Sequence, residues 1–136
     1  MSPILLDTHA AVWAADGSLK GEAAALVEGA AERDELLLSP ITAWEIGLLV
    51  KKKRLSLSST VEDYVRALFG QPGVVLAALT PTIAVAATAL PESLRADPAD
   101  RILIATAAAY GARFVTRDRE IRAYAKSTAH IRCIAC

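Results

Sequence analysis

The chain has 136 residues, which is enough for one compact domain and too few for two well-packed ones. Apolar residues make up 54% of it, and its 15 basic and 15 acidic side chains cancel, so overall charge excludes no class of partner and indicates none. The distribution of charge is uneven, because residues 101–136 carry 7 basic and 2 acidic side chains. Such a locally basic surface fits either nucleic-acid binding or an ordinary solvated helix face.

Neither the start of the chain nor its uncharged segment at 67–91 predicts secretion or membrane insertion. The start lacks a basic region, and Asp7 interrupts the first apolar run, so no signal peptide is expected. Residues 67–91 carry no charge, but Pro72, Gly73 and Pro81 divide them into a short strand and a separate helix, which argues against a membrane span.

The cysteines Cys133 and Cys136 have C-x-x-C spacing near the end of the chain. No helix follows them and no second pair completes a zinc site, so we expect neither metal binding nor redox chemistry. Cys133 is expected to pack in a terminal strand. Two cysteines make no disulfide framework, so a reducing cytoplasmic location is the default.

Short apolar runs alternate with longer helical patterns along the chain. The predicted order is a strand at 4–6, helices at 8–15 and 18–31, a strand at 35–39, a helix from Pro40 to about Lys53, a helix at 60–69, a strand at 74–79, a helix from Pro81 to about Leu90, a helix from Pro98 that ends at Gly111, a strand at 113–116, a helix at 118–126 and a strand at 131–135. Strands that alternate with helices predict a parallel sheet covered on both faces.

Four carboxylates lie where such a sheet binds ligands, outside the carboxyl ends of its strands. Asp7 directly follows the first strand, and Asp118 follows the fourth by one residue. Glu45 lies in the second turn of the helix after the second strand, and Asp100 lies in the first turn of a later helix. These side chains, far apart in sequence, can converge on one edge of the sheet.

Each aspartate also has a structural interpretation. Asp7, Asp97 and Asp118 can each cap a helix, and the helix dipole favours Asp100 in a first turn. From the residues alone, the capping and the site interpretations are about equally supported.

Glu45 differs, because it is too far into its helix to cap it and lies within an apolar stripe with Ile41, Leu48 and Leu49. A buried carboxylate needs a compensating partner. The alternatives are a bound metal ion or a tertiary salt bridge, for example to Arg101 or Arg117.

Several classes of site are disfavoured. The chain has no G-x-S-x-G, no Walker A motif and no second aspartate two residues after Asp7, which disfavours serine hydrolases, P-loop NTPases and aspartyl-phosphate hydrolases. A receiver-type phospho-acceptor domain is disfavoured because the third strand does not end in aspartate and the fifth does not end in lysine. We expect Trp13 and Trp44 in the core, and His9 is too near a helix start to suggest a general base.

Four segments occur in order: "LLDTHAAVW", "SPITAWEIGLL", "DPADRILIATA" and "FVTRD". Together they resemble the PIN-domain ribonucleases, in particular the toxin halves of VapBC toxin–antitoxin pairs, over about residues 3–135. The resemblance implies that residues 1–136 form a single PIN domain, a three-layer α/β/α sandwich around a parallel sheet of about five strands.

The same resemblance implies a Mg²⁺- or Mn²⁺-dependent endoribonuclease that cuts single-stranded regions of RNA. The catalytic and metal-binding positions that it implies are Asp7, Glu45, Asp100 and Asp118. The possible outer-shell groups are Asp97, Thr8 and Thr116, and the candidate RNA-binding residues are Arg101, Arg117 and Arg119, with the basic cluster at 51–54.

By the same resemblance, the products carry 5′-phosphate and 3′-hydroxyl ends, and the partners are a VapB-type antitoxin and a second copy of the chain. The antitoxin is expected to place a basic side chain in the acidic site. An alternative function is that of a binding module, which would keep the PIN-like fold without catalysis. The complete set of four carboxylates argues against this alternative.

Overall fold

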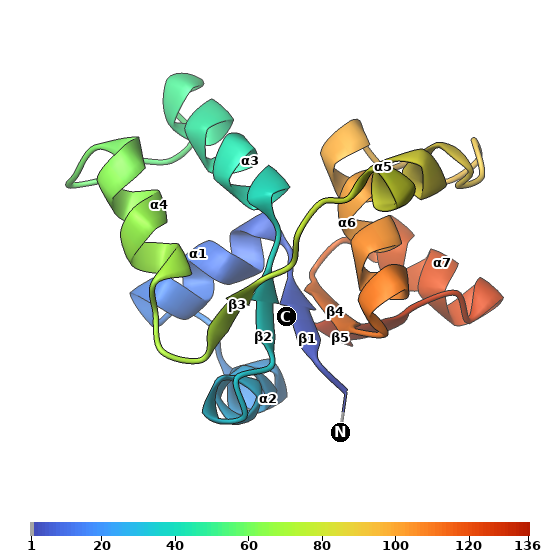
Figure 1. The fold of residues 1–136 in the computed structure, drawn as a ribbon, viewed down its shortest axis with the longest axis horizontal. Coiled ribbons are helices and arrows are strands. Elements are labelled where there is room, and N and C mark those ends of the chain that lie inside the picture. The colour runs from blue at the N-terminus through green and yellow to red at the C-terminus, as the bar shows by residue number, and fades with distance from the viewer. Residues whose placement is uncertain (1) are drawn as a thin grey trace.

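Five parallel strands form one sheet in the computed structural model, which describes residues 2–136 and places seven helices around that sheet (Figure 1). The strands are β1 (Ile4–Leu6), β2 (Leu36–Leu38), β3 (Val74–Leu76), β4 (Arg113–Thr116) and β5 (Arg132–Ala135). The helices are α1 (Thr8–Asp16), α2 (Gly21–Glu32), α3 (Pro40–Lys51), α4 (Val61–Phe69), α5 (Pro81–Thr88), α6 (Pro98–Tyr110) and α7 (Arg119–Thr128). The predicted α/β sandwich with a parallel sheet of about five strands is confirmed.

The order of strands in the sheet is β3-β2-β1-β4-β5, and every neighbouring pair is parallel. Strands β2 and β3 are therefore added in turn on one side of β1. The chain then crosses to the other side of β1, where β4 and β5 are added in turn. Leu5 at the centre pairs with Leu37 on one side and Phe114 on the other. The order of strands reverses between β1 and β4, and ligands of such sheets bind at this point, outside the carboxyl ends.

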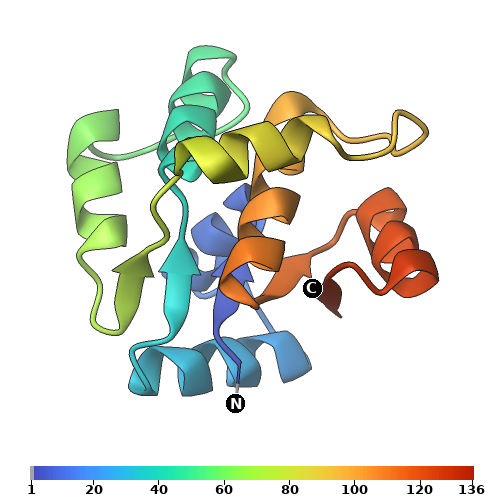
Figure 2. The same ribbon diagram turned by 45° about the vertical axis from the view of Figure 1, so that its right-hand side comes forward.

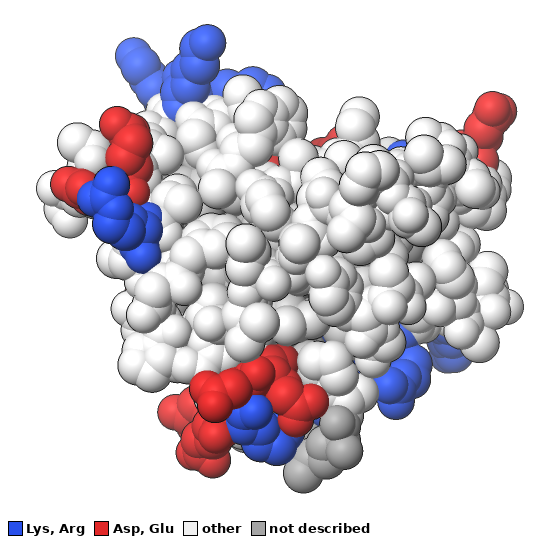
Figure 3. Space-filling model, viewed as in Figure 1, with Lys and Arg blue, Asp and Glu red and all other residues white. Residues whose placement is uncertain are grey.

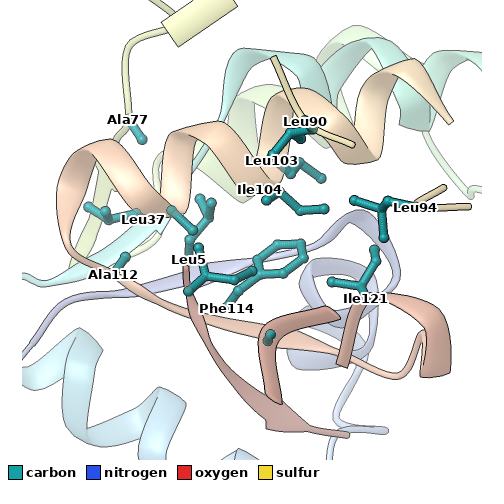
Figure 4. Packing of buried hydrophobic residues seen from close by; sticks show 13 residues of the cluster. Leu5, Leu37, Ala77, Leu90, Leu94, Leu103, Ile104, Ala112, Phe114 and Ile121 are labelled. Atoms are coloured by element: carbon teal, nitrogen blue, oxygen red, sulfur yellow. The ribbon is translucent and has the colours of Figure 1, made fainter. Parts of the chain in front are cut away.

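The core has two parts because alternate residues of each strand face opposite sides of the sheet. Leu5 and Phe114 pack against α6, α7 and the chain that precedes α6 (Figure 4). Ile4 and Leu6 face the other way and pack against α1, α2 and α4. Strands β1 and β2 are buried along their whole length, as expected of a parallel sheet with helices on both faces.

Three helices mark the two ends of the sheet. In Figure 2 strands β2 and β3 point upward, α2 lies across the amino ends of the strands, and α3 and α5 lie above the carboxyl ends of β2 and β3. Ser39 caps α3 and Pro40 occupies its first turn, as predicted. Helix α3 contacts α1, α4 and α6, so it links the two helical layers at the edge where the carboxylates were expected.

Three predictions need correction. The third strand ends at Leu76 rather than at residue 79, because its partner β2 ends at Leu38, whose carbonyl accepts the last bond from the Ala77 N–H. Trp44 is not in the core, since 57% of its surface is exposed, and Trp13 is only half-buried. Both tryptophans lie near the acidic residues described below.

Cys133 lies in the terminal strand, as expected. Cys133 is in β5, is partly buried and packs against the core, and both it and Cys136 are free thiols. Within residues 2–136, no helix is long and apolar enough to cross a membrane.

An uncharged face covers the edge of the sheet at β3 and α5. Figure 3 shows its centre without charged groups, which gather at its margins. Val75 and Leu76 on the edge strand and Val85 on α5 are exposed there, and Val85 is exposed over 68% of its surface. We call the exposed part of β3 and α5 the uncharged face.

Gly73, which leads into β3, gives a test of this architecture. Its φ is +85°, and a Cβ at this position would lie 2.0 Å from the carbonyl oxygen of Ala31 in α2. Gly73→Ala should therefore lower the free energy of unfolding by about 2 kcal/mol or more, measured by urea denaturation. Gly17→Ala is the matched control: φ there is +81° with nothing within 4 Å, so only backbone strain of about 1 kcal/mol applies. Equal losses for both variants would contradict this packing.

Candidate active site

A pocket of about 600 Å³ opens at the carboxyl ends of β1 and β4, where the strand order reverses. All four carboxylates predicted from the sequence line it, together with Asp97. The lining residues are Asp7, Thr8, His9, Glu45, Asp97, Asp100, Thr116, Arg117, Asp118, Arg119 and Glu120. Four helices, one strand and the residues that precede three of these helices contribute to this pocket, so the fold brings together residues that are more than one hundred positions apart.

Three of the aspartates are helix caps. Asp7, Asp97 and Asp118 cap α1, α6 and α7, and each accepts the backbone N–H three residues on at 2.8–3.0 Å through its Oδ1. Each cap hydrogen bond occupies one carboxylate oxygen, which leaves the second for another ligand. The structural interpretation of these residues is therefore correct, and it does not exclude the site interpretation.

Glu45 accepts a hydrogen bond from the Thr8 hydroxyl at 2.5 Å. The salt bridge considered as an alternative is absent: across residues 2–136, ion pairs join only Arg33 to Glu35 and Arg66 to Asp63. A half-buried carboxylate thus lies in the pocket with a hydroxyl donor and without a protein cation.

Asp97 belongs to a trio of carboxylates that are close enough together to hold one metal ion. One carboxylate oxygen from each of Glu45, Asp97 and Asp100 lies within 4.8 Å of the other two. The sequence suggested only an outer-shell place for Asp97, whereas the structure puts it in this trio. Its position at the N-cap of α6 explains this, because the cap residue and the residue three positions on lie side by side at the helix start.

Burial, together with neighbouring acidic charges, raises the pKa values of Asp7, Glu45 and Asp100. Burial, and then the charges of Asp97 and Glu45, raise the pKa of Asp100 from 3.8 to about 7. Burial is also the main reason that the pKa values of Asp7 and Glu45 are raised. A cluster of this kind costs stability unless a cation neutralises it.

Two arginines line the same pocket. The guanidinium of Arg117 lies 5.1 Å from the centre of the Trp13 ring, a cation–π contact that holds this side chain at the rim. The Trp13 ring also lies 5.7 Å from that of His9, one turn earlier in α1. Arg119 lines the pocket as well, so two of the three predicted RNA-binding arginines are next to the carboxylates.

Arg101 has a different place. Its guanidinium donates hydrogen bonds at 2.8–3.3 Å to the backbone carbonyls of Leu90, Pro91, Leu94 and Ala96. It therefore holds the loop between α5 and α6 and is not among the residues that line the pocket. The sequence could have indicated this role. The loop before α6 forms no strand or helix, so its backbone carbonyls need hydrogen-bond donors, and Arg101 follows this loop in the first turn of α6.

Sequence reasoning missed His9 and Trp13 as neighbours of the site. Residues four positions apart in a helix lie on one face, so His9 and Trp13 could have been predicted to lie together in the helix that follows Asp7. Trp44 directly precedes Glu45, and the largely apolar sequence of its helix gave no sign that the indole faces solvent.

The residues of the pocket fit a divalent cation. Hard cations such as Mg²⁺ and Mn²⁺ take oxygen ligands, and the free oxygens of the capping aspartates, with Glu45 and Asp100, are of this kind. No cysteine, and no histidine other than the exposed His9, lines the pocket, so the donor set does not favour zinc.

This fold and this acidic pocket define a PIN-type domain, and residues 4–127 match the profile of the PIN domain. The chain belongs to the PIN-domain family. It is 36% identical over 126 residues to Ribonuclease VapC22 of Mycobacterium tuberculosis, covering 91% of this chain and 93% of that protein.

Solved structures give the same fold. VapBC2 from Rickettsia felis, bound to a DNA fragment from its promoter, has a TM-score of 0.69 at 13% identity and covers 97% of both chains. DNA-bound VapBC from Salmonella typhimurium has a TM-score of 0.68 at 18% identity and covers 99% of this chain and 98% of that chain.

The raised pKa of Asp100 predicts how stability depends on pH. Between its ordinary pKa of 3.8 and the folded value of about 7, the folded protein holds a proton that the unfolded chain releases. The free energy of unfolding should therefore fall as pH rises through this window. In EDTA, the Tm of the wild type should be higher at about pH 5 than at about pH 7.5.

Asp100→Asn removes the titrating group and should make the Tm less dependent on pH, whereas Asp63→Asn, on exposed α4, should not. Mn²⁺ should raise the wild-type Tm most at the higher pH, because cation and protons compete for the same oxygens. A Tm in EDTA that rises with pH, or is unmoved by Mn²⁺ at any pH, would refute the acidic cluster as a cation site.

Proposed function

We propose that this protein is a VapC-type toxin, a ribonuclease that uses Mg²⁺ or Mn²⁺ to cut single-stranded regions of RNA and so inhibits growth. Residues 1–136 act as a single PIN domain, with Asp7, Glu45, Asp100 and Asp118 as catalytic metal ligands. The observation that carries the proposal is the convergence of six carboxylates, the five named above and Glu120, on one pocket without a protein cation paired to any of them across residues 2–136. The 36% identity to a ribonuclease over most of the chain supports the same conclusion.

The carboxylates would hold the cation with oxygens fixed by the protein. The capped aspartates cannot turn freely, because each has one oxygen bound to a helix N-terminus. Thr8 fixes Glu45 in the same way. Asp97 joins this group as a ligand or an outer-shell partner. A divalent cation bound there supplies Lewis-acid chemistry, lowering the pKa of a water and neutralising charge on the phosphate.

No side chain in the pocket is suited to nucleophilic attack. The hydroxyl of Thr8 donates to Glu45, and the hydroxyl of Thr116 accepts the Asp118 N–H. Water is therefore the nucleophile. It would attack the phosphorus as the bond to the 3′-oxygen breaks, which leaves a 5′-phosphate on one fragment and a 3′-hydroxyl on the other. Arg117 and Arg119 bind the RNA backbone beside the carboxylates, which positions the strand without reading its sequence.

The partner of a toxin of this kind is a VapB-type antitoxin. Structural neighbours that are themselves VapBC complexes support this assignment. The acidic pocket offers a binding site for a basic side chain of the antitoxin, which would fill the place of the cation. RNA as substrate and an antitoxin as inhibitor both imply a cytoplasmic location.

Cleavage of single-stranded RNA by the purified protein tests the proposal. Activity should require Mn²⁺ or Mg²⁺ and disappear in EDTA. Asp7→Asn, Glu45→Gln, Asp100→Asn and Asp118→Asn should each lower the rate about 100-fold or more, because each removes charge that holds the cation. Glu22→Gln, on exposed α2, is the matched control and should leave the rate unchanged.

Full cleavage by the Glu45 or Asp100 variant would show that the carboxylates are structural only. A wild-type protein that binds RNA but does not cleave it with either cation would favour a binding module. Sequencing of the RNA ends after pulsed expression in cells would identify the target and the ends produced.

The uncharged face is the proposed homodimer interface. Its exposed apolar side chains, Val75 and Leu76 on the edge strand and Val85 on α5, favour burial against a second copy. Val85→Asp should convert the dimer into a monomer of 14.4 kDa in light scattering, because a buried charge without a partner is costly. Ala25→Asp, at an exposed position on α2, should remain dimeric. A wild type that is monomeric, or a Val85→Asp protein that stays dimeric, would contradict this interface.

A further inference from the structure

A second groove adjoins the acidic pocket. It has a volume of about 360 Å³ and runs between α3 and the start of α6. His9, Glu45 and Asp97 line both cavities, so the two form one continuous surface. The roles proposed above for the acidic residues do not explain the rest of this groove.

The wall of the groove that α3 provides has an apolar part and a basic end. Trp44, Leu48 and Lys52 follow one another at four-residue spacing and therefore lie along one side of the helix. Trp44 is exposed over 57% of its surface. The close ring contacts within residues 2–136 join His9 to Trp13 and Tyr124 to His130, so the indole of Trp44 has no aromatic partner there.

Two cations complete the groove. Lys52 and Arg54 line its far end, and neither takes part in the ion pairs found within residues 2–136. Arg117 and Arg119 line the acidic pocket but not this groove. The acidic pocket and the groove are therefore each lined by two cations that take part in no ion pair within residues 2–136, and such cations attract phosphates to an acidic centre that would by itself repel them.

We propose that this groove is a nucleotide subsite, in which an unpaired base stacks on the indole of Trp44 while Lys52 and Arg54 bind the adjacent phosphates. The subsite rests on the proposed ribonuclease activity and extends it to the path of the substrate. An RNA strand offers both an aromatic face and negative charge, which matches the indole and the two cations together. Because only a base free of pairing can stack in this way, the subsite selects single-stranded RNA.

Kinetics with a labelled random-sequence pool of single-stranded RNA, cleaved by the full chain in Mn²⁺, test the subsite. Trp44→Ala should raise KM roughly tenfold or more, the loss expected for one base–aromatic stack, with kcat little changed. Trp44→Phe keeps an aromatic face and should restore most of the affinity. Tyr110→Ala, which removes an exposed aromatic side chain at the far end of α6, is the matched control and should leave KM unchanged.

The cations are tested by the dependence of KM on salt. Replacing Lys52 and Arg54 together by Gln should reduce the slope of log affinity against log salt by roughly 1.4, since each phosphate contact on a single strand contributes about 0.7. Lys20→Gln, at the exposed N-cap of α2, should leave the slope as in the wild type.

The outcomes separate this subsite from the proposed function. If the wild type does not cleave RNA, both fail. If the wild type cleaves and Trp44→Ala has an unchanged KM, the subsite alone is refuted. If Trp44→Ala changes the mass of the particle in light scattering, and KM returns to normal at protein concentrations that restore the dimer, Trp44 belongs to a contact between copies and the subsite is equally refuted.

Discussion

The arrangement of the pocket depends on the hydrogen bond between an aspartate oxygen and the N-terminus of a helix. Asp7, Asp97 and Asp118 each make this bond, and the three helices that they cap begin at the same edge of the sheet. The positive end of each helix dipole therefore points at the place where negative charge gathers. The same hydrogen bond fixes one oxygen of each carboxylate and leaves the other available for a cation. The three aspartates can therefore cap their helices and bind a cation at the same time.

Glu45 is held by a different kind of hydrogen bond, and its charge is therefore less well compensated than those of the capping aspartates. It lies within α3 rather than at its start, so no helix terminus offsets its charge, and the Thr8 hydroxyl is its hydrogen-bond donor. Its charge then contributes to the raised pKa of Asp100. The centre of the sheet is buried on both faces, and the stability gained there offsets the unfavourable free energy of the acidic cluster.

The sequence predicted the order of all the strands and helices, because buried parallel strands and capped helices leave strong local patterns. It also predicted which carboxylates share the pocket, since residues that follow parallel strands meet at one edge. It failed for side chains whose role is set by distant partners. Arg101 looked like a phosphate-binding residue, but four carbonyls from the preceding loop surround its guanidinium. Trp44 looked like a core residue, because an apolar helix does not reveal which of its sides is left uncovered.

The hydrogen bonds of Arg101 connect the start of α6 to the loop that follows α5. The loop between α5 and α6 has no strand or helix of its own, yet it is tied at four carbonyls to the residue that follows Asp100. Helix α5 also packs along α6. Helix α5, the loop and the start of α6 therefore form one packed unit, which joins the uncharged face to the helix start that carries Asp97 and Asp100.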